Sequence, residues 1–137
     1  MSTIDFGVPA EQVVVTGAQC FDQWFGRAPS TDRATFCGRI GLPDRPFLLY
    51  VCSALFWGSP VEAEFVCRWI RSLRSSEDPD VRRAAILIRP HPSRRKEWSG
   101  ADLAGLGPVV LWGDNPIDAQ SRHDYFDSLY HSAVVVG

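Results

Sequence analysis

The chain of 137 residues is 45% apolar and 22% charged, which is typical of one folded domain and excludes a globally disordered chain. Its net charge of −2 at pH 7 argues against the nonspecific nucleic-acid binding that a clear basic excess supports. No signal-peptide pattern opens the sequence, and the longest apolar run is too short to span a bilayer, so we expect a cytoplasmic protein without a membrane span.

The first third of the chain predicts short elements. Local signals indicate a β-branched strand over 13–15, a helical turn over 21–25 and a helix from about 31 to 40. Either Ser30 or Thr31 can cap this helix, and Gly41 ends it.

Two continuous apolar runs, 46–52 and 84–88, predict buried strands. Continuous rather than alternating apolarity indicates burial on both faces, as in a parallel sheet covered by helices. Between the runs, Ser59, Pro60 and Glu62 form a capping box that predicts an amphipathic helix from about 60 to 76.

The last third of the chain predicts two more strands and one more helix. The strands fall at 109–112 and 133–136, and a loop over 113–122 leads to a helix that Asp124 can cap and that turns Tyr125, Leu129 and Tyr130 inward. Strands that alternate with helices predict right-handed crossovers and a doubly wound sheet. The expected fold class is therefore α/β: a Rossmann-like, three-layer αβα domain with a mostly parallel sheet, truncated after its last strand.

The sequence predicts no metal site. The four cysteines (Cys20, Cys37, Cys52 and Cys67) are widely spaced, with no CxxC motif and no Cys/His pair at ligand spacing. Cys52 lies in an apolar strand and Cys67 on a predicted helix, so we expect these two to be buried, reduced thiols.

The loop Arg89-Pro90-His91-Pro92, which ends the second buried strand, is the main candidate for a binding site. Ligands of open α/β sheets bind outside the carboxyl ends of the strands. The prolines fix the backbone around His91, and an imidazole beside a guanidinium suits a phosphate through charge-assisted hydrogen bonds. By residue type alone, a rigid turn whose histidine bonds the backbone is an equal alternative.

Other polar residues give weaker signals. Ser53 lies at the same edge, after the first buried strand, whereas Ser59 is better explained as a helix cap than as a ligand residue. The segment 124–132 contains Asp, Ser and His, but their spacing on one helix cannot form a hydrolase triad. We therefore predict no catalytic residue, and the lack of a GxGxxG or Walker sequence gives no cofactor signature.

Five stretches in chain order carry a resemblance to a known family. They are VTGAQ (15–19), FDQWF (21–25), LYVCS (49–53), RPHP (89–92) and DYFDSLYHS (124–132). Together they resemble the GT-B-type bacterial glycosyltransferase-like proteins, among them surface-polysaccharide (capsule) enzymes and the glycerophosphotransferases that build teichoic acids. The resemblance implies that 1–26 is an N-terminal strand with a connector, and that 27–137 is the first half of a Rossmann-like donor domain.

The resemblance also implies a ligand. In related sugar-nucleotide transferases a His-Pro pair contacts the donor phosphate, so His91 and Pro92 take this role by implication. Arg89 would neutralise the same pyrophosphate, and Ser53 resembles the small residue of the first donor-domain loop. The chain would then be the donor-binding portion of a glycosyltransferase-like protein of polysaccharide biosynthesis, with a nucleotide-activated sugar or polyol phosphate (a CDP-polyol) as its ligand.

The chain departs from this family after its last strand. Relatives continue with a loop and a helix that help to hold the donor, and they have an N-terminal acceptor domain, so we expect this chain to be inactive alone. It would be part of a longer chain or a homo-oligomer that pairs exposed strand edges. The alternative is a non-catalytic α/β binding or oligomerisation module of unknown ligand.

Overall fold

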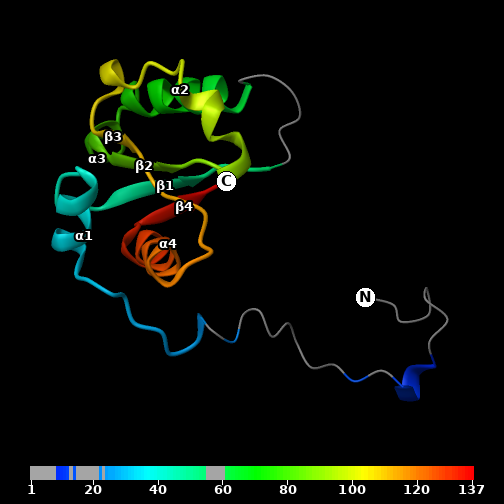
Figure 1. The fold of residues 1–137 in the computed structure, drawn as a ribbon. Coiled ribbons are helices and arrows are strands. Elements are labelled where there is room, and N and C mark those ends of the chain that lie inside the picture. The colour runs from blue at the N-terminus through cyan, green and yellow to red at the C-terminus, as the bar shows by residue number, and fades with distance from the viewer. Residues whose placement is uncertain (1–8, 13, 15–21, 23, 55–60) are drawn as a thin grey trace.

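Four strands form one parallel sheet in the order β3-β2-β1-β4 (Figure 1). The strands are β1 (Phe47–Val51), β2 (Ala85–Arg89), β3 (Val109–Leu111) and β4 (Val134–Val136). The structure is a computed structural model that describes residues 9–12, 14, 22, 24–54 and 61–137. In the sheet, β2 pairs with one side of β1 and is followed by β3, whereas β4 pairs with the other side of β1. The predicted α/β, Rossmann-like fold with a parallel sheet is confirmed.

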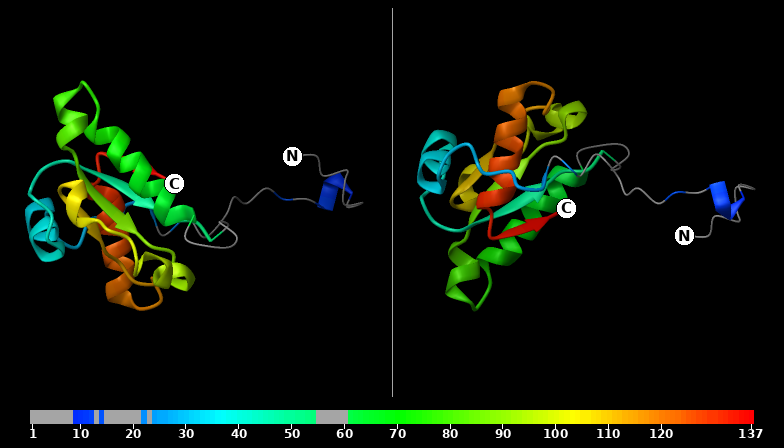
Figure 2. Two further views of the ribbon diagram at one scale, coloured as in Figure 1. Left: turned by 90° about the horizontal axis from the view of Figure 1, so that it is seen from above. Right: turned by 90° about the horizontal axis from the view of Figure 1, so that it is seen from below.

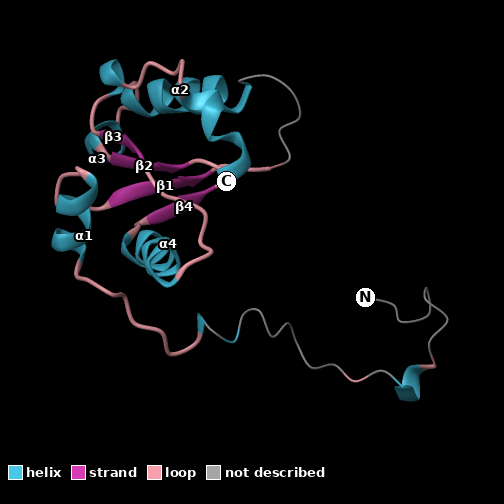
Figure 3. Ribbon diagram, viewed as in Figure 1, coloured by secondary structure: helices cyan, strands magenta, loops and turns pink. Residues whose placement is uncertain are grey.

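Helices cover both faces of this sheet (Figures 1 and 2). One face carries α2 (Val61–Arg74), and the other carries α1 (Arg33–Ile40) and α4 (Ala119–His131). The short helix α3 (Pro79–Arg83) leads into β2, and η2 (Ala10–Gln12) is a single 3-10 turn near the N-terminus. Between β2 and β3 the chain forms only the 3-10 helices η4 (Pro92–Trp98) and η5 (Ala104–Leu106) (Figure 3).

The alternation of side chains along β1 divides the core into two layers. Phe47 and Leu49 are fully buried against α1, whereas Tyr50 and Cys52 are buried on the α2 side. All five residues of β2 are buried, as expected for an interior strand of a covered parallel sheet. The apolar residues of β2 and of β1 therefore supply the burial that stabilises the domain.

Two helix starts differ from the predicted ones. The N-cap of α1 is Asp32, whose carboxylate accepts from Thr35 N–H at 2.8 Å, and not Ser30 or Thr31. The N-cap of α4 is Asp118, whose carboxylate accepts from Ser121 N–H at 2.9 Å, so this helix begins well before the predicted cap at Asp124. The hydrogen bonds from Thr35 and Ser121 hold the pKa of each capping carboxyl below its ordinary value.

The predicted faces of α4 were partly wrong. Tyr130 is 60% exposed, and Phe126, Asp127 and Ser128 are the buried residues of the helix. The apolar stripe was misplaced because Asp127 and Ser128 find hydrogen-bond partners inside the protein, so polar side chains occupy inward positions.

Several predictions concern residues outside the described ranges. Val13 and Val15 lie there, and so do Ser59 and Pro60 of the predicted capping box. The helix itself is confirmed as α2, and the end of α1 at Gly41 is confirmed by a left-handed backbone with φ 81°. No helix within the described residues is long and apolar enough to cross a membrane.

Candidate functional site

A hollow of about 240 Å³ lies at the carboxyl edge of the sheet. Because the strands are parallel, the segments that follow β1, β2 and β3 meet at this one edge. Its lining comes from those segments and from α4: Val51, Cys52, Arg89, Pro90, His91, Pro92, Asp114, Asn115, Pro116 and Tyr125. The structure thus brings together three of the four residues predicted for the site, and Ser53 is the one that does not line the hollow.

Arg89 ends β2 and is only 5% exposed. Its guanidinium carbon lies 5.6 Å from the ring centroid of Trp112 and 5.0 Å from that of Tyr125. Nη2 donates to the carbonyl oxygen of Asp114 at 3.1 Å, whereas Nη1 is buried and has no hydrogen-bond partner. Burial lowers the pKa of this guanidinium, and the neighbouring negative groups work against that shift. An arginine nevertheless keeps its charge, so a positive charge is buried at the carboxyl edge of the sheet.

No described carboxylate neutralises this cation. None of its nitrogens lies within 4.0 Å of a carboxylate oxygen in the described part of the chain. The two nearby carboxylates are engaged elsewhere, Asp114 with Arg95 and Asp124 with Arg39, each at 2.8 Å. Cation–π contacts offset only about 2 kcal/mol of the cost of burying a charge. Arg89, which lines the hollow, therefore has a positive charge that no described carboxylate pairs with and a buried Nη1 without a hydrogen-bond partner.

Gly113 leaves space for the guanidinium of Arg89. Its φ is +121°, and a Cβ built at this position would lie 2.5 Å from the Cζ atom of Arg89. Only a residue without a side chain allows the backbone to lie against the arginine in this way. Arg95 fastens the same loop from outside, because its Nη1 donates to the carbonyl oxygen of Gly113 at 2.8 Å and pairs with Asp114.

His91 begins the 3-10 helix η4 and is held by its own cap. Its Nδ1 accepts from Ser93 N–H at 3.3 Å and lies 2.8 Å from the Ser93 hydroxyl. Since Nδ1 is an acceptor, the neutral ring carries its proton on Nε2, which makes no hydrogen bond to the described residues. The histidine can therefore donate from Nε2 without giving up its cap. The geometry of this loop is compatible with both interpretations, a rigid turn and a ligand contact.

The residues after β1 are held by a buried carboxylate. Ser53 N–H donates to the carboxylate of Glu62 at 2.8 Å, and Glu62 is 1% exposed. Burial and the charge of Glu62 raise the pKa of the Cys52 thiol to about 12. Although Cys52 lines the hollow, its thiol therefore stays protonated at neutral pH and is no nucleophile. No group of three or more metal-ligating side chains occurs in the described residues.

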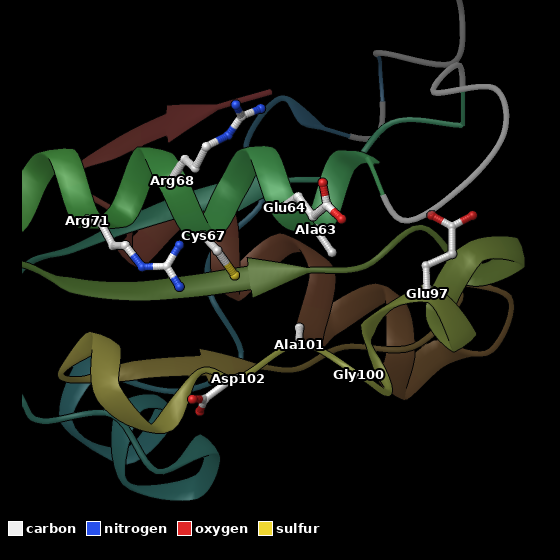
Figure 4. A pocket seen from close by; sticks show the side chains of 9 residues that line it. All are labelled: Ala63, Glu64, Cys67, Arg68, Arg71, Glu97, Gly100, Ala101 and Asp102. Atoms are coloured by element: carbon white, nitrogen blue, oxygen red, sulfur yellow. The ribbon is translucent and has the colours of Figure 1, made fainter.

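Two of the larger hollows lie away from this charge. One of about 470 Å³ lies between α2 and the segment after η4, where Cys67 and Ala101 face each other between mixed charges such as Arg71 and Asp102 (Figure 4). Another, of about 650 Å³, lies beside α3 and the start of β1. The latter hollow also has a buried nitrogen without a hydrogen-bond partner, Nε of Arg45, but it lies at the opposite edge of the sheet, where β1 and β2 begin. The buried charge together with its position at the carboxyl edge therefore identifies the candidate site.

Three partners of Arg89 were missed by sequence reasoning: Trp112, Gly113 and Tyr125. Each lies far along the chain from Arg89, and no local pattern links them. The one available signal was a glycine directly after an apolar strand.

Comparison of the chain with family models, curated proteins and solved structures gave no match.

Proposed function

We propose that this domain binds the phosphate group of a nucleotide-activated sugar or polyol at the carboxyl edge of its sheet, without performing transfer itself. The observation that supports this most is the buried guanidinium of Arg89, which lines the hollow, has no carboxylate partner among the described residues and has an Nη1 without a hydrogen-bond partner. A phosphate oxygen would supply both the missing charge and the missing acceptor.

Two further features favour an anionic ligand at this place. His91 lines the same hollow, and its Nε2, which makes no hydrogen bond to the described residues, can serve as a second donor. The carboxyl edge of a Rossmann-like sheet is where such domains bind their ligands. The ordered resemblance to glycosyltransferase-like proteins, in which a His-Pro pair contacts the donor phosphate, supports the nucleotide-activated class within this reading.

A thermal-shift screen with CDP, UDP, GDP and CMP tests the proposal. A ligand at ten times its Kd stabilises the native state by about 1.4 kcal/mol, so we expect a rise of several degrees in Tm with at least one nucleotide. Arg89→Met should abolish the rise, and His91→Ala should reduce it. Arg33→Met, which removes an arginine with an exposed ion pair to Asp44, is the matched control and should keep the full rise. A rise that survives in Arg89→Met, or no rise with any of the four nucleotides, would contradict the proposal.

A second candidate function, an oligomerisation module, is favoured by the edge strand β4. Among the described residues β4 pairs only with β1, and Val134 and Val135 are about half exposed on opposite faces of the sheet. An unpaired apolar edge favours pairing with another strand. We propose a second copy of the chain as the partner, joined edge to edge through β4.

Sedimentation equilibrium tests whether the chain dimerises through β4. The wild-type chain should be a dimer at micromolar concentration, and Val135→Lys should shift it to a monomer because a charge at the edge opposes pairing. Phe65→Lys, at an exposed position on α2, is the control and should leave the dimer intact. A monomeric wild type at high concentration would exclude the module.

A further inference from the structure

A second hollow adjoins the first at Pro116 and Tyr125. It has a volume of about 300 Å³ and is lined by Trp24, Arg27, Pro116, Arg122 and Tyr125. Pro116 and Tyr125 also line the hollow at Arg89, so the two spaces share a wall. The guanidinium of Arg89 lies over the Tyr125 ring at 5.0 Å, and Arg27 and Arg122 belong to the second space.

Both arginines of the second hollow are fixed by contacts that leave their charge unneutralised. Arg27 donates to the carbonyl oxygen of Arg122 at 3.3 Å, and its Cζ lies 4.6 Å from the ring centroid of Phe126. Arg122 donates to the carbonyl oxygen of Ile117 at 2.6 Å. In the described residues neither has a carboxylate oxygen within 4.0 Å.

The acids of the same region are already occupied. The Asp118 carboxylate caps α4 by bonding Ser121, and the Asp124 carboxylate pairs with Arg39 at 2.8 Å. The second hollow therefore keeps a net positive lining that the protein does not compensate from the residues described.

Aromatic side chains line this hollow beside the half-buried Arg27 and the exposed Arg122. Trp24 stacks on Phe126 at 5.6 Å and meets Tyr125 edge to face at 6.0 Å. These contacts hold residues 24–27 against α4. Apolar walls lower the local dielectric, so charge–charge attraction is stronger there than in open solvent.

We propose that the second hollow is an oxyanion subsite for a second phosphate of the same ligand, held by Arg122 and Arg27. The inference rests on the proposed function, because Arg89 would hold the first phosphate. It narrows the ligand to compounds with linked phosphates and assigns Arg27 and Arg122 a binding role that the sequence does not indicate.

Isothermal titration with inorganic phosphate, pyrophosphate and tripolyphosphate at constant ionic strength tests the subsite. We expect the wild-type chain to bind pyrophosphate, tripolyphosphate or both at least ten-fold more tightly than orthophosphate. Arg122→Gln and Arg27→Gln should each reduce that preference at least five-fold while changing the Kd for orthophosphate less than two-fold. Arg33→Gln, distant from both hollows, should change neither value, and circular dichroism verifies that each variant is folded.

The outcomes separate the two proposals. Orthophosphate binding that depends on Arg89, with an unchanged preference in both Arg122→Gln and Arg27→Gln, would overturn the second subsite alone. A wild-type chain that binds linked phosphates no more tightly than orthophosphate would overturn it as well. If none of the three anions binds, both the subsite and the phosphate-binding function are wrong.

Discussion

Replacing Gly113 with alanine should lower the free energy of unfolding by about 2–4 kcal/mol and abolish nucleotide-induced stabilisation. Two effects add up. A non-glycine residue is strained at a φ of +121°, and the new methyl group would lie 2.5 Å from the Cζ of Arg89. The guanidinium is enclosed by the rings of Trp112 and Tyr125, so it can move away only by breaking these contacts. Urea denaturation followed by circular dichroism measures the loss, and the nucleotide screen measures binding.

Gly38→Ala is the matched control for this substitution. Gly38 lies within α1, and a Cβ at this position would meet nothing within 4 Å. Because alanine favours a helix interior over glycine, we expect this variant to gain about 0.5–1 kcal/mol and to bind nucleotides as the wild type does. If Gly113→Ala is as stable as the wild type and still binds, then the glycine does not set the position of Arg89.

Replacing Asp127 with alanine should destabilise the domain by about 2–3 kcal/mol. The carboxylate is fully buried and accepts three hydrogen bonds: from Ser30 N–H at 2.9 Å, from the Ser30 hydroxyl, and from the Thr31 hydroxyl at 3.3 Å. These bonds tie α4 to the segment that leads into α1. Their loss should also expose the segment before α1 to limited proteolysis.

Two variants control for this effect. Asp80→Ala removes an exposed carboxylate that makes no hydrogen bond within the described residues, and it should change the stability by less than about 0.5 kcal/mol. Asp127→Asn retains one acceptor oxygen and should fall between the alanine variant and the wild type. Equal stability of Asp127→Ala and the wild type would mean that the three hydrogen bonds do not hold the segment in place.

The elements that could be predicted are those whose signal is local. The runs at β1 and β2 are apolar throughout, and only burial on both faces explains such a run, so the parallel sheet follows from them. Gly41 likewise marks the end of α1 because the left-handed conformation favours glycine. The start of α4 was misplaced because Asp118 and Asp124 are both good caps, and sequence alone does not decide between them.

The site could be predicted only in outline. The position of Arg89 and His91 after a buried strand placed them at the carboxyl edge, and the structure agrees with that placement. Their surroundings depend on Trp112, Gly113 and Tyr125, which only the folded chain brings near. The burial of the Asp127 carboxylate could not be predicted for the same reason, because its partners Ser30 and Thr31 are distant in sequence. Such polar burial arises from tertiary contacts that local propensity does not encode.

The hydrogen bonds between Asp127 and Ser30 also have a kinetic consequence. They join residues 97 apart, whereas the bond from Arg89 to Asp114 spans 25. Closing the longer loop costs more chain entropy, so we expect the contact at Arg89 to form first and the segment that leads into α1 to dock onto α4 afterwards. The hollow that contains Trp24 and Arg27 would then be the last part of the domain to assemble, and the first to open when the native state fluctuates.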